Sequence, residues 1–480
     1  MINSLKKLEE MVSKCDDIIS HVVKTKDKTE VSMFYVDNMI SQDALGSSVI
    51  KSIKEMCFSK GENKCEVFIK NINSGGTTYA KDADDALNKL FSGFVVAHIY
   101  GSSKYIVIPL QGYEKRSVTE PPTSAVLKGP REGFTEDLNT NLSLIRKRLK
   151  TTDLVVKNIM VGKYTSTRIS VLYIDSIADT NLVKRVFKRI KEINIDGIID
   201  SFYVQTLIEE RKSIMFKQIG NTEKPEIAVS RMLEGRIAII VDGSPIILTV
   251  PYIFLEDIQN GDDYYSHTAR AIFVRVLRLF GLVIAIILPG VYVALESFHY
   301  RVLPIDFLVS LMNSAQGLSF PPLIEILFVL FLFEILNEAS IRMPKYLGMA
   351  LSIVGALILG DTAVQANLIS PPSVMMVAIS GITLYTVPDQ ATPCGLLRVI
   401  FTVIGGVAGF YGLLVGFLFL TTLLLDFDSF GTPYFAPYAP TIKSDKKDGL
   451  FKAQLINMKT RPKSIPNKNR VRMNNGKDII

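Results

Sequence analysis

The stretch IFVRVLRLFGLVIAIILPGVYVAL, residues 272–295, decides the overall organisation of this chain. Its apolar core begins at Leu279, and roughly 20 apolar residues cross about 30 Å of hydrocarbon as a helix. Arg270, Arg275 and Arg278 stand at its start. Because positive charges favour the cytoplasmic side of a membrane, the stretch predicts a first spanning helix that is entered from the cytoplasm.

Amino-acid composition differs before and after the start of this apolar stretch. Charged and apolar residues mix from residue 1 to about 270, whereas apolar runs dominate residues 271–426. This split excludes a purely soluble enzyme, and it equally excludes a transporter made of membrane helices throughout. We predict a two-part cytoplasmic domain of α/β or α+β class, followed by an α-helical transmembrane domain with four to five hydrophobic segments.

Internal boundaries follow from changes in pattern. Strand-like runs such as 31–36, 65–69 and 168–174 alternate with helical stretches, and the segment 112–133 is rich in Pro, Gly and charge. The strings FYVD and LYID, each a strand that ends in Asp, are compatible with two related units, although short strings of this kind are common. The predicted parts are an N-terminal subdomain 1–111, a linker 112–133, a second subdomain 134–270, a membrane domain 271–426 and a basic cytoplasmic tail 427–480.

The charge of the chain is concentrated in this tail. Residues 441–480 hold eleven Lys and Arg against three Asp, which accounts for the whole formal net charge of +7. A diffuse basic surface for nucleic acid is therefore excluded, and the tail is expected either to lie on anionic membrane lipid or to stay solvated. The first 25 residues lack the apolar core of a signal peptide, so we expect the N-terminus in the cytoplasm.

No catalytic pattern accompanies these parts. The sequence has no phosphate-binding glycine loop and no zinc-protease spacing, and its four histidines are scattered. We expect neither enzyme activity nor a cofactor nor a metal site.

The second apolar stretch, residues 320–345, contains Glu325 and Glu334. A carboxylate at the centre of a membrane helix costs at least about 2.5–3.5 kcal/mol, so it needs a partner, water or a proton. Glu334 is either an ion-pathway residue or half of a buried ion pair, for which we predict Arg342 as the partner. Glu325, close to the helix start, is expected at the membrane interface.

Three further apolar stretches follow, of which residues 396–425 are long enough to cross with tilt. Gly405, Gly409, Gly412 and Gly416 form two GxxxG spacings there, which either bring helices close together or line a pore. Five full spans would place the basic tail outside, so we predict four spans. The segment that does not fully cross is then 320–337 or 346–360.

The order of these parts resembles the A subunit of the GerA family of spore germination receptors of endospore-forming bacteria. Five strings carry the resemblance: KGPREGFTEDLNTNLSLIRKRLK (128–150), TEKPEIAVSRMLEGRIAIIVDGSP (222–245), FPPLIEILFVLFLFEILNEASIRMPK (320–345), SIVGALILGDTAVQANLISPPSVMMVAISGI (352–382) and SFGTPYFAPYAP (429–440). Asn337 departs from the family, which has Arg in the corresponding stretch.

The resemblance implies a nutrient-sensing complex in the spore inner membrane, with the N-terminal domain on the core side. The implied partners are a transporter-like B subunit and a lipoprotein C subunit, and copies of the A subunit would assemble into a cation channel. Within the matching strings we expect Arg131, Glu132, Arg146 and Arg148 to make contacts between subdomains or protomers.

Two other classes of membrane protein are alternatives to a channel. A secondary transporter would show about ten spans and an inverted repeat, which this sequence lacks. A membrane scaffold that signals without conducting would use the same helices. Substitution of Gly409 or Glu334 separates these classes, because it changes ion leak in a channel but only assembly in a scaffold.

Overall fold

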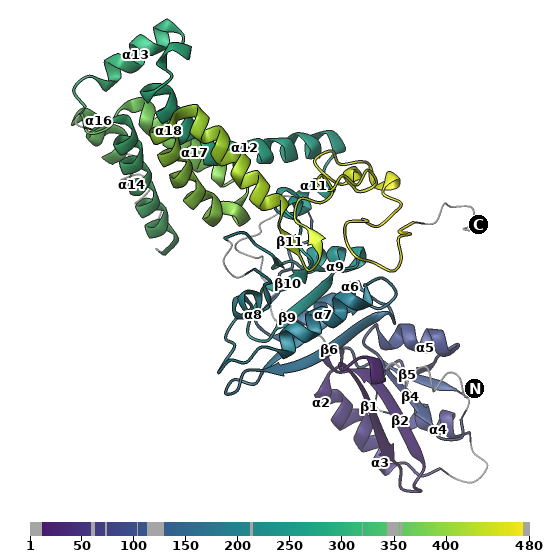
Figure 1. Cartoon of the computed structure of the whole chain (residues 1–480). Helices are drawn as coiled ribbons and strands as arrows, with labels where there is room; N and C mark the ends of the chain where they lie inside the picture. The colour runs from purple at the N-terminus through teal and green to yellow at the C-terminus, as the bar shows by residue number, and fades with distance from the viewer. Residues whose placement is uncertain are drawn as a thin grey trace.

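The computed structural model describes residues 12–58, 63–72, 74–102, 104–112, 129–211, 215–318, 320–342, 355 and 358–473. Figure 1 shows two layered sheet units at one end, a bundle of helices at the other and the C-terminal segment against the region where they meet.

The first unit contains a five-stranded sheet whose two faces are covered by helices. Helices α3 and α4 cover one face and α5 covers the other. Its elements are β1 (Ile18–Lys24), β2 (Glu30–Val36), η1 (Asp37–Met39), α2 (Gln42–Ala44), η2 (Leu45–Ile50), α3 (Lys51–Glu55), α4 (Lys64–Asn71), β3 (Thr78–Tyr79), α5 (Ala83–Leu90), β4 (Val95–Ile99) and β5 (Tyr105–Ile108).

The strand expected at 65–69 is wrong, because these residues form helix α4. Cys65, Phe68 and Ile72 are buried against the sheet. Their spacing of three and four residues is the helical period, which a short apolar run does not distinguish from a strand.

The second unit repeats this architecture. Helices α7 and α8 cover one face of its sheet, and α6 and α9 cover the other. Its elements are α6 (Leu138–Arg148), β6 (Leu154–Val161), β7 (Thr167–Ile174), α7 (Thr180–Lys191), α8 (Ser201–Ile208), β8 (Gly220–Thr222), α9 (Pro225–Glu234), β9 (Ile237–Val241), β10 (Ile247–Val250), α10 (Leu255–Ile258) and α11 (Gly261–Tyr264). Aspartates cap α6, α7 and α8, each accepting a bond from a first-turn backbone N–H.

The two sheets have the same topology. Their strand orders are β1-β2-β4-β5-β3 and β6-β7-β9-β10-β8, so each strand of one has a counterpart five places later in the other. All pairs are antiparallel, which makes both units α+β. Asp37 and Asp175 directly follow the corresponding strands β2 and β7. The two aspartate-terminated strings thus mark equivalent positions of a repeated unit.

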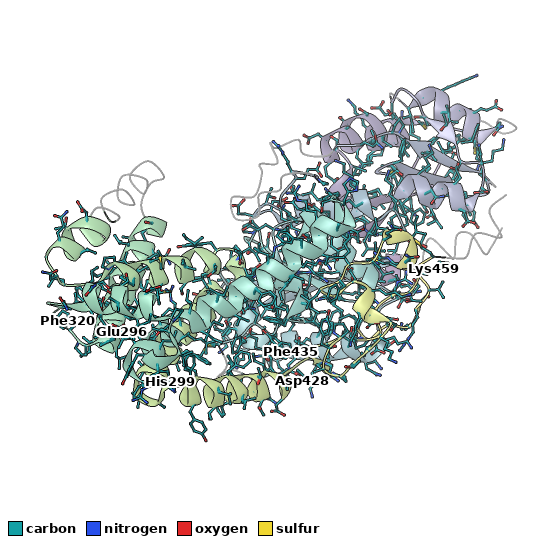
Figure 2. All side chains as sticks on the ribbon, turned by 90° about the horizontal axis from the view of Figure 1, so that it is seen from above. Glu296, His299, Phe320, Asp428, Phe435 and Lys459 are labelled. Carbon is teal, nitrogen blue, oxygen red and sulfur yellow. The ribbon has the colours of Figure 1, made fainter. Side chains whose placement is uncertain are left out.

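The helical region follows α11. Its elements are α12 (Thr268–Ser297), η3 (Tyr300–Val302), α13 (Ile305–Ala315), α14 (Pro322–Arg342), η4 (Ile358–Thr362), α16 (Ala363–Gln365), α17 (Pro371–Leu384), η5 (Pro388–Gln390) and α18 (Ala391–Leu425). In Figure 2, Glu296, His299 and Phe320 lie at the end of this region far from the sheets, whereas Lys459 lies beside the sheets.

Helix α18 is folded into a hairpin at Gly409. That residue has φ 58° and ψ −151°, a conformation open essentially to glycine alone. A methyl group added at Gly416 would lie 3.3 Å from Cδ1 of Ile404. In a straight helix those two residues would be roughly 18 Å apart along the axis, so the arms 391–408 and 410–425 run back against each other. The expectation of one tilted span over 396–425 is therefore wrong.

Within the described residues, two segments are long and apolar enough to cross a membrane: Thr268–Ser297 and Pro388–Leu425, the second of which contains the hairpin. Ile305–Ala315 and Pro371–Leu384 are shorter apolar helices. Most of the predicted segment 346–360 lies outside the described residues, so the total of four to five segments stays a prediction.

The C-terminal segment packs on the second sheet unit and contains β11 (Asp428–Ser429), β12 (Thr432–Pro433), η6 (Asp445–Lys447) and η7 (Leu455–Asn457). The buried Lys452 donates to the carbonyl of Asp263 at 2.6 Å, and Arg461 donates to that of Leu233 at 2.7 Å. Lys452 and Arg461 are thus held by carbonyl groups of the protein, whereas most other bases of residues 441–473 are exposed, so the solvated or lipid-bound tail stays a prediction. Both ends of the helical region lie at the sheet units, because Arg275 on α12 pairs with Asp263 and Arg211 pairs with Asp426, directly after α18.

Candidate functional site

An ion pair inside the helical region is the main candidate site. Glu334 on α14 pairs with Nη2 of Arg398 on the first arm of α18. The Arg398 side chain is 1% exposed, whereas that of Glu334 is 41% exposed. Arg398 also donates to Oγ of Ser380 at 3.3 Å and lies over the ring of Phe333, 5.5 Å from its centroid. A buried cation therefore holds a carboxylate that reaches the outer surface of this single copy.

The predicted partner of Glu334 is wrong. Arg342 instead pairs with Glu338, one turn earlier on the same helix, with Nε 2.6 Å from Oε1. Arg342 follows Glu334 by eight residues, or roughly 12 Å along the axis, which is too far for a direct bond on one helix. Arg398 comes from a distant part of the sequence, so spacing along α14 gave no signal for it.

The four glycines of α18 have contacts within this chain. A Cβ on Gly405 would stand 2.3 Å from the carbonyl oxygen of Gly290, so α12 and α18 cross there at backbone distance. Gly409 forms the hairpin turn, and a Cβ there would lie 2.9 Å from the His299 ring. Gly412 and Gly416 face the opposite arm of the hairpin. This arrangement supports the packing interpretation, and pore lining stays a proposal.

Glu325 lies in a buried polar cluster at the end of the bundle far from the sheets. Its Oε1 accepts from the backbone N–H of Ser370 at 2.6 Å and from Oγ of Ser370 at 2.7 Å. Ser373 bonds the Ser370 hydroxyl at 2.9 Å. The glutamate is thus tied to the first turn of α17, where helix N–H groups favour a negative charge.

A second charged network joins helix α12 to the second sheet unit and to the C-terminal segment. The fully buried Arg275 donates to Asp263 at 3.0 Å and to Asp448 at 3.1 Å, and Arg278 donates to Asp263 at 2.9 Å. Burial raises the pKa of Asp448, and the bonds from Arg275 and Tyr264 act against that rise. The arginines that the sequence assigned to membrane topology therefore also fix the C-terminal segment to α12.

The two sheet units are joined by a buried ion pair. Arg146 on α6 holds Asp17 with two bonds, Nε to Oδ2 at 2.9 Å and Nη2 to Oδ1 at 2.8 Å. Each side chain is 1% exposed. Burial acts to lower the pKa of Arg146, but the neighbouring Asp17 carboxylate raises it overall. Arg146 thus makes a contact between subdomains, as expected.

Glu132 and Arg148 pair with each other instead, with Nη2 2.6 Å from Oε2. Burial acts to raise the pKa of Glu132, and the bonds from Arg148 and Lys147 lower it overall. This pair ties the end of the predicted linker to α6, so it is not a contact between the sheet units. Arg131 adjoins it in the chain, and its predicted role in protomer contacts remains a prediction.

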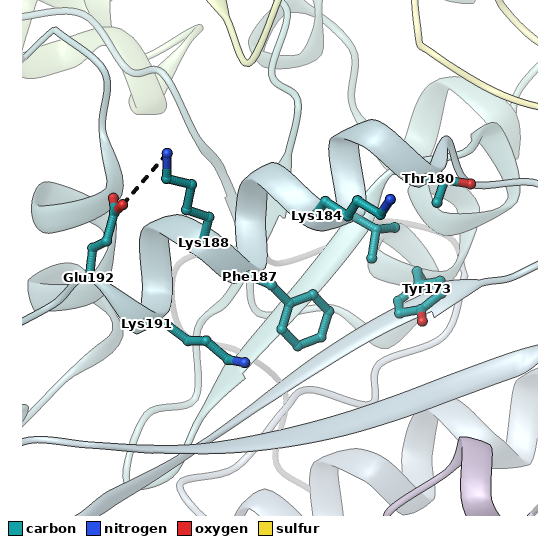
Figure 3. A pocket seen from close by; sticks show the side chains of 8 residues that line it. Tyr173, Thr180, Lys184, Phe187, Lys188, Lys191 and Glu192 are labelled. Atoms are coloured by element: carbon teal, nitrogen blue, oxygen red, sulfur yellow. Dashed lines mark ion pairs between the residues drawn. The ribbon is translucent and has the colours of Figure 1, made fainter.

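A shallow groove lies along α7 on the surface of the second unit (Figure 3). It measures about 620 Å³ and is lined by aromatic Tyr173 and Phe187 and by Lys184, Lys188 and Lys191. Lys188 lies 3.8 Å from Glu192 one turn later. The groove is an open basic surface.

The comparisons with known proteins agree on one group. The sequence model described as "Bacillus/Clostridium GerA spore germination protein" matches residues 6–464. Spore germination protein KA of Bacillus subtilis (strain 168) is 35% identical over 98% of this chain and 87% of that protein. Spore germination protein B1 of the same strain is 31% identical over 96% of each chain. GerQA of Bacillus cereus is 30% identical over 98% of this chain and 94% of that protein.

A solved structure is also similar to part of this chain. The crystal structure of the N-terminal domain of the A subunit of the Bacillus megaterium spore germinant receptor GerK3 is 28% identical. It covers 52% of this chain and 94% of that chain, with a TM-score of 0.42.

Proposed function

Because this chain belongs to the GerA family of spore germination proteins, we propose that it is the membrane subunit of a nutrient germinant receptor. Several copies assemble into a nutrient-gated ion channel in the spore inner membrane, with the sheet units facing the spore core. A transporter-like B subunit and a lipoprotein C subunit complete the receptor. The similarity of nearly the whole chain to spore germination proteins supports the role in germination.

The half-exposed Glu334 carboxylate supports the channel. It lies eight residues before the end of α14, inside an apolar helix. Left against lipid, a carboxylate at this depth costs several kcal/mol, even beside Arg398. If a second copy covers the Glu334 face of α14 and water fills the space between the copies, the carboxylate stays hydrated and the cost of burying it in lipid is removed. The Glu334 carboxylates of successive copies then form a row that attracts cations.

The continuation of α14 supports the same surface. The Glu338 and Arg342 side chains, on the last turns of the helix, are 60% and 78% exposed. These two side chains follow Glu334 at intervals of four residues, so one face of α14 carries exposed charge from Glu334 to the helix end.

The test replaces Glu334 in the complete receptor. Spores carrying E334Q are triggered with nutrient, and the potassium release rate is divided by the amount of this chain in the membrane. A channel predicts that the release rate for each receptor falls severalfold, because the carboxylate that attracts the ion is gone. D306N is the matched control, since Asp306 is an exposed carboxylate on α13.

The alternative, a scaffold that signals without conducting, predicts a different result. In a scaffold E334Q lowers only the amount of assembled receptor, and the release rate for each remaining receptor equals that of the unchanged protein. That result would overturn the channel and leave the germination role standing.

A further inference from the structure

A buried carboxylate connects the sheet units to the link between the last membrane helices. Asp257 lies on α10, and its side chain is 5% exposed. Its Oδ2 accepts from the hydroxyl of Tyr252 at 2.7 Å and from Nε2 of Gln390 at 2.7 Å. Gln390 ends η5, the short link that leads from α17 into α18. One carboxylate oxygen therefore holds both the sheet unit and the membrane hairpin.

A lysine shared by two carboxylates completes this junction. Nζ of Lys217, just before β8, is 2.6 Å from Oδ1 of Asp389 and 3.9 Å from Oδ2 of Asp257. Asp389 belongs to η5 and is 56% exposed. Two carboxylates thus compete for one ammonium group, so the cluster carries one excess negative charge when both are ionised.

The cluster has access to water. A cleft of about 620 Å³ lies between the second sheet unit and the link, and Asp257, Asp389, Thr386 and Arg278 are among its lining residues. Protons therefore reach the cluster from the side of the sheet units.

The groups facing Asp257 come from every element packed against it. Burial and the charge of Asp389 raise its pKa, whereas Lys217 and the two hydrogen bonds lower it, and the result is a pKa of about 6. Tyr434 lies near it and is neutral near pH 6, because burial raises the pKa of its hydroxyl, and the Cys394 thiol lies nearby. The neighbouring Glu256 is turned away and pairs with Arg231, with Nη2 3.1 Å from Oε2.

We propose that Asp257 is a proton-operated latch between the sheet units and the α17–α18 link. In its charged form it accepts both hydrogen bonds, and the one from Gln390 holds η5 against the sheet unit. Protonation weakens the bond from Gln390, so η5 loosens there, while Lys217 keeps its pair with Asp389. Because η5 continues directly into the hairpin arm that carries Arg398, the protonation state is passed to the membrane region. The latch does not depend on whether the helices conduct ions.

The test follows the junction in the full chain in lipid nanodiscs. The sequence has no Trp, so F216W provides a single reporter next to Lys217, at a ring position 6.4 Å from Tyr434. We expect its emission to titrate between pH 4.5 and pH 8 with one midpoint near the pKa of Asp257. Added D257N abolishes this titration.

Two further variants keep the proposal testable if D257N fails to fold. D389N removes a like charge and lowers the midpoint, whereas K217M removes an opposite charge and raises it. The exposed Glu192 supplies the control E192Q, which leaves the midpoint unchanged. Midpoints that move in the same direction in D389N and K217M would overturn the latch, as would a titration that persists in D257N.

Hydrogen exchange on the same samples measures the loosening itself. After correction for the intrinsic pH dependence, backbone amides of residues 385–392 should exchange severalfold faster below the midpoint than above it. In D257N they should exchange fast on both sides. Equal protection of this segment on both sides in the unchanged protein would show that protonation does not release η5, and would overturn the proposal.

Discussion

Neutralising Asp17 should open the contact between the two sheet units. Asp17→Asn leaves the Arg146 guanidinium buried without its counter-charge, because both side chains are 1% exposed. Removing one partner of a buried pair costs about 3–5 kcal/mol. Each 1.4 kcal/mol is about a factor of ten in an equilibrium, so opening should become at least a hundredfold more frequent.

Cys15 reports this opening directly. Its thiol is fully buried and lies 3.3 Å from the carbonyl oxygen of Leu154 in the second unit. In the full chain in detergent, with the exposed Cys57 replaced by Ser, the labelling rate of Cys15 by a thiol reagent measures the opening. We expect D17N to raise this rate about a hundredfold or more.

Two comparisons make the prediction specific. E132Q removes a carboxylate whose side chain is 35% exposed in its pair with Arg148. Exposed pairs contribute about 0–1 kcal/mol, so Cys15 labelling should change severalfold at most. The double variant D17N/R146M removes both charges and should label more slowly than D17N. A labelling rate in D17N within threefold of the starting protein would refute the reasoning that the pair holds the units together.

Three further predictions concern the helical region and its junction. Gly405→Ala places a methyl group 2.3 Å from the backbone of Gly290, so the thermal midpoint of unfolding in detergent should drop by several degrees. Gly416→Ala should change this midpoint little, because its methyl group meets only a side chain, at 3.3 Å. Gly409→Ala should cost about 1–3 kcal/mol, because L residues rarely adopt this backbone conformation, and a smaller unfolding free energy in denaturant would show it. Burial raises the pKa of Asp257 from 3.8 to about 6, so between these two pH values the folded protein holds a proton that the unfolded chain has released. The unfolding free energy should therefore fall as pH rises between these values. D257N should flatten this slope in a denaturant series, and an unchanged slope would contradict the assignment.

Several features were predictable because they depend on local pattern. The apolar stretch after Arg278 marked the entry into the helical region, and the change in composition near residue 270 separated it from the sheets. The helix N-caps and the strand-ending Asp37 and Asp175 depend on bonds or turns within a few residues, so the sequence carries their signal directly. The resemblance to the GerA family could also be identified from the sequence, because it depends on long strings in a fixed order.

Other features depend on which distant segments meet. The sequence identified Glu334 as a carboxylate in need of a partner, but the partner proved to be Arg398, 64 residues later in the chain. The hairpin of α18 could not be separated from one long span, because both have the same hydrophobic length and differ only in the backbone of Gly409. Within the tail, Lys452 shows the same dependence, because it is buried where the carbonyl group of Asp263 lies within reach.

The division of the chain, the order of its parts and the residues whose charge needs compensation follow from the amino-acid sequence. How that compensation is made depends on the folded arrangement. A charged group that is buried must be paired, and hydropathy predicts from the sequence which charged groups will be buried. The identity of the partner depends on packing over tens of residues, as for Asp17 with Arg146 and Asp257 with Gln390. Local sequence carries no record of such distances, because they arise only when the sheets and helices have assembled.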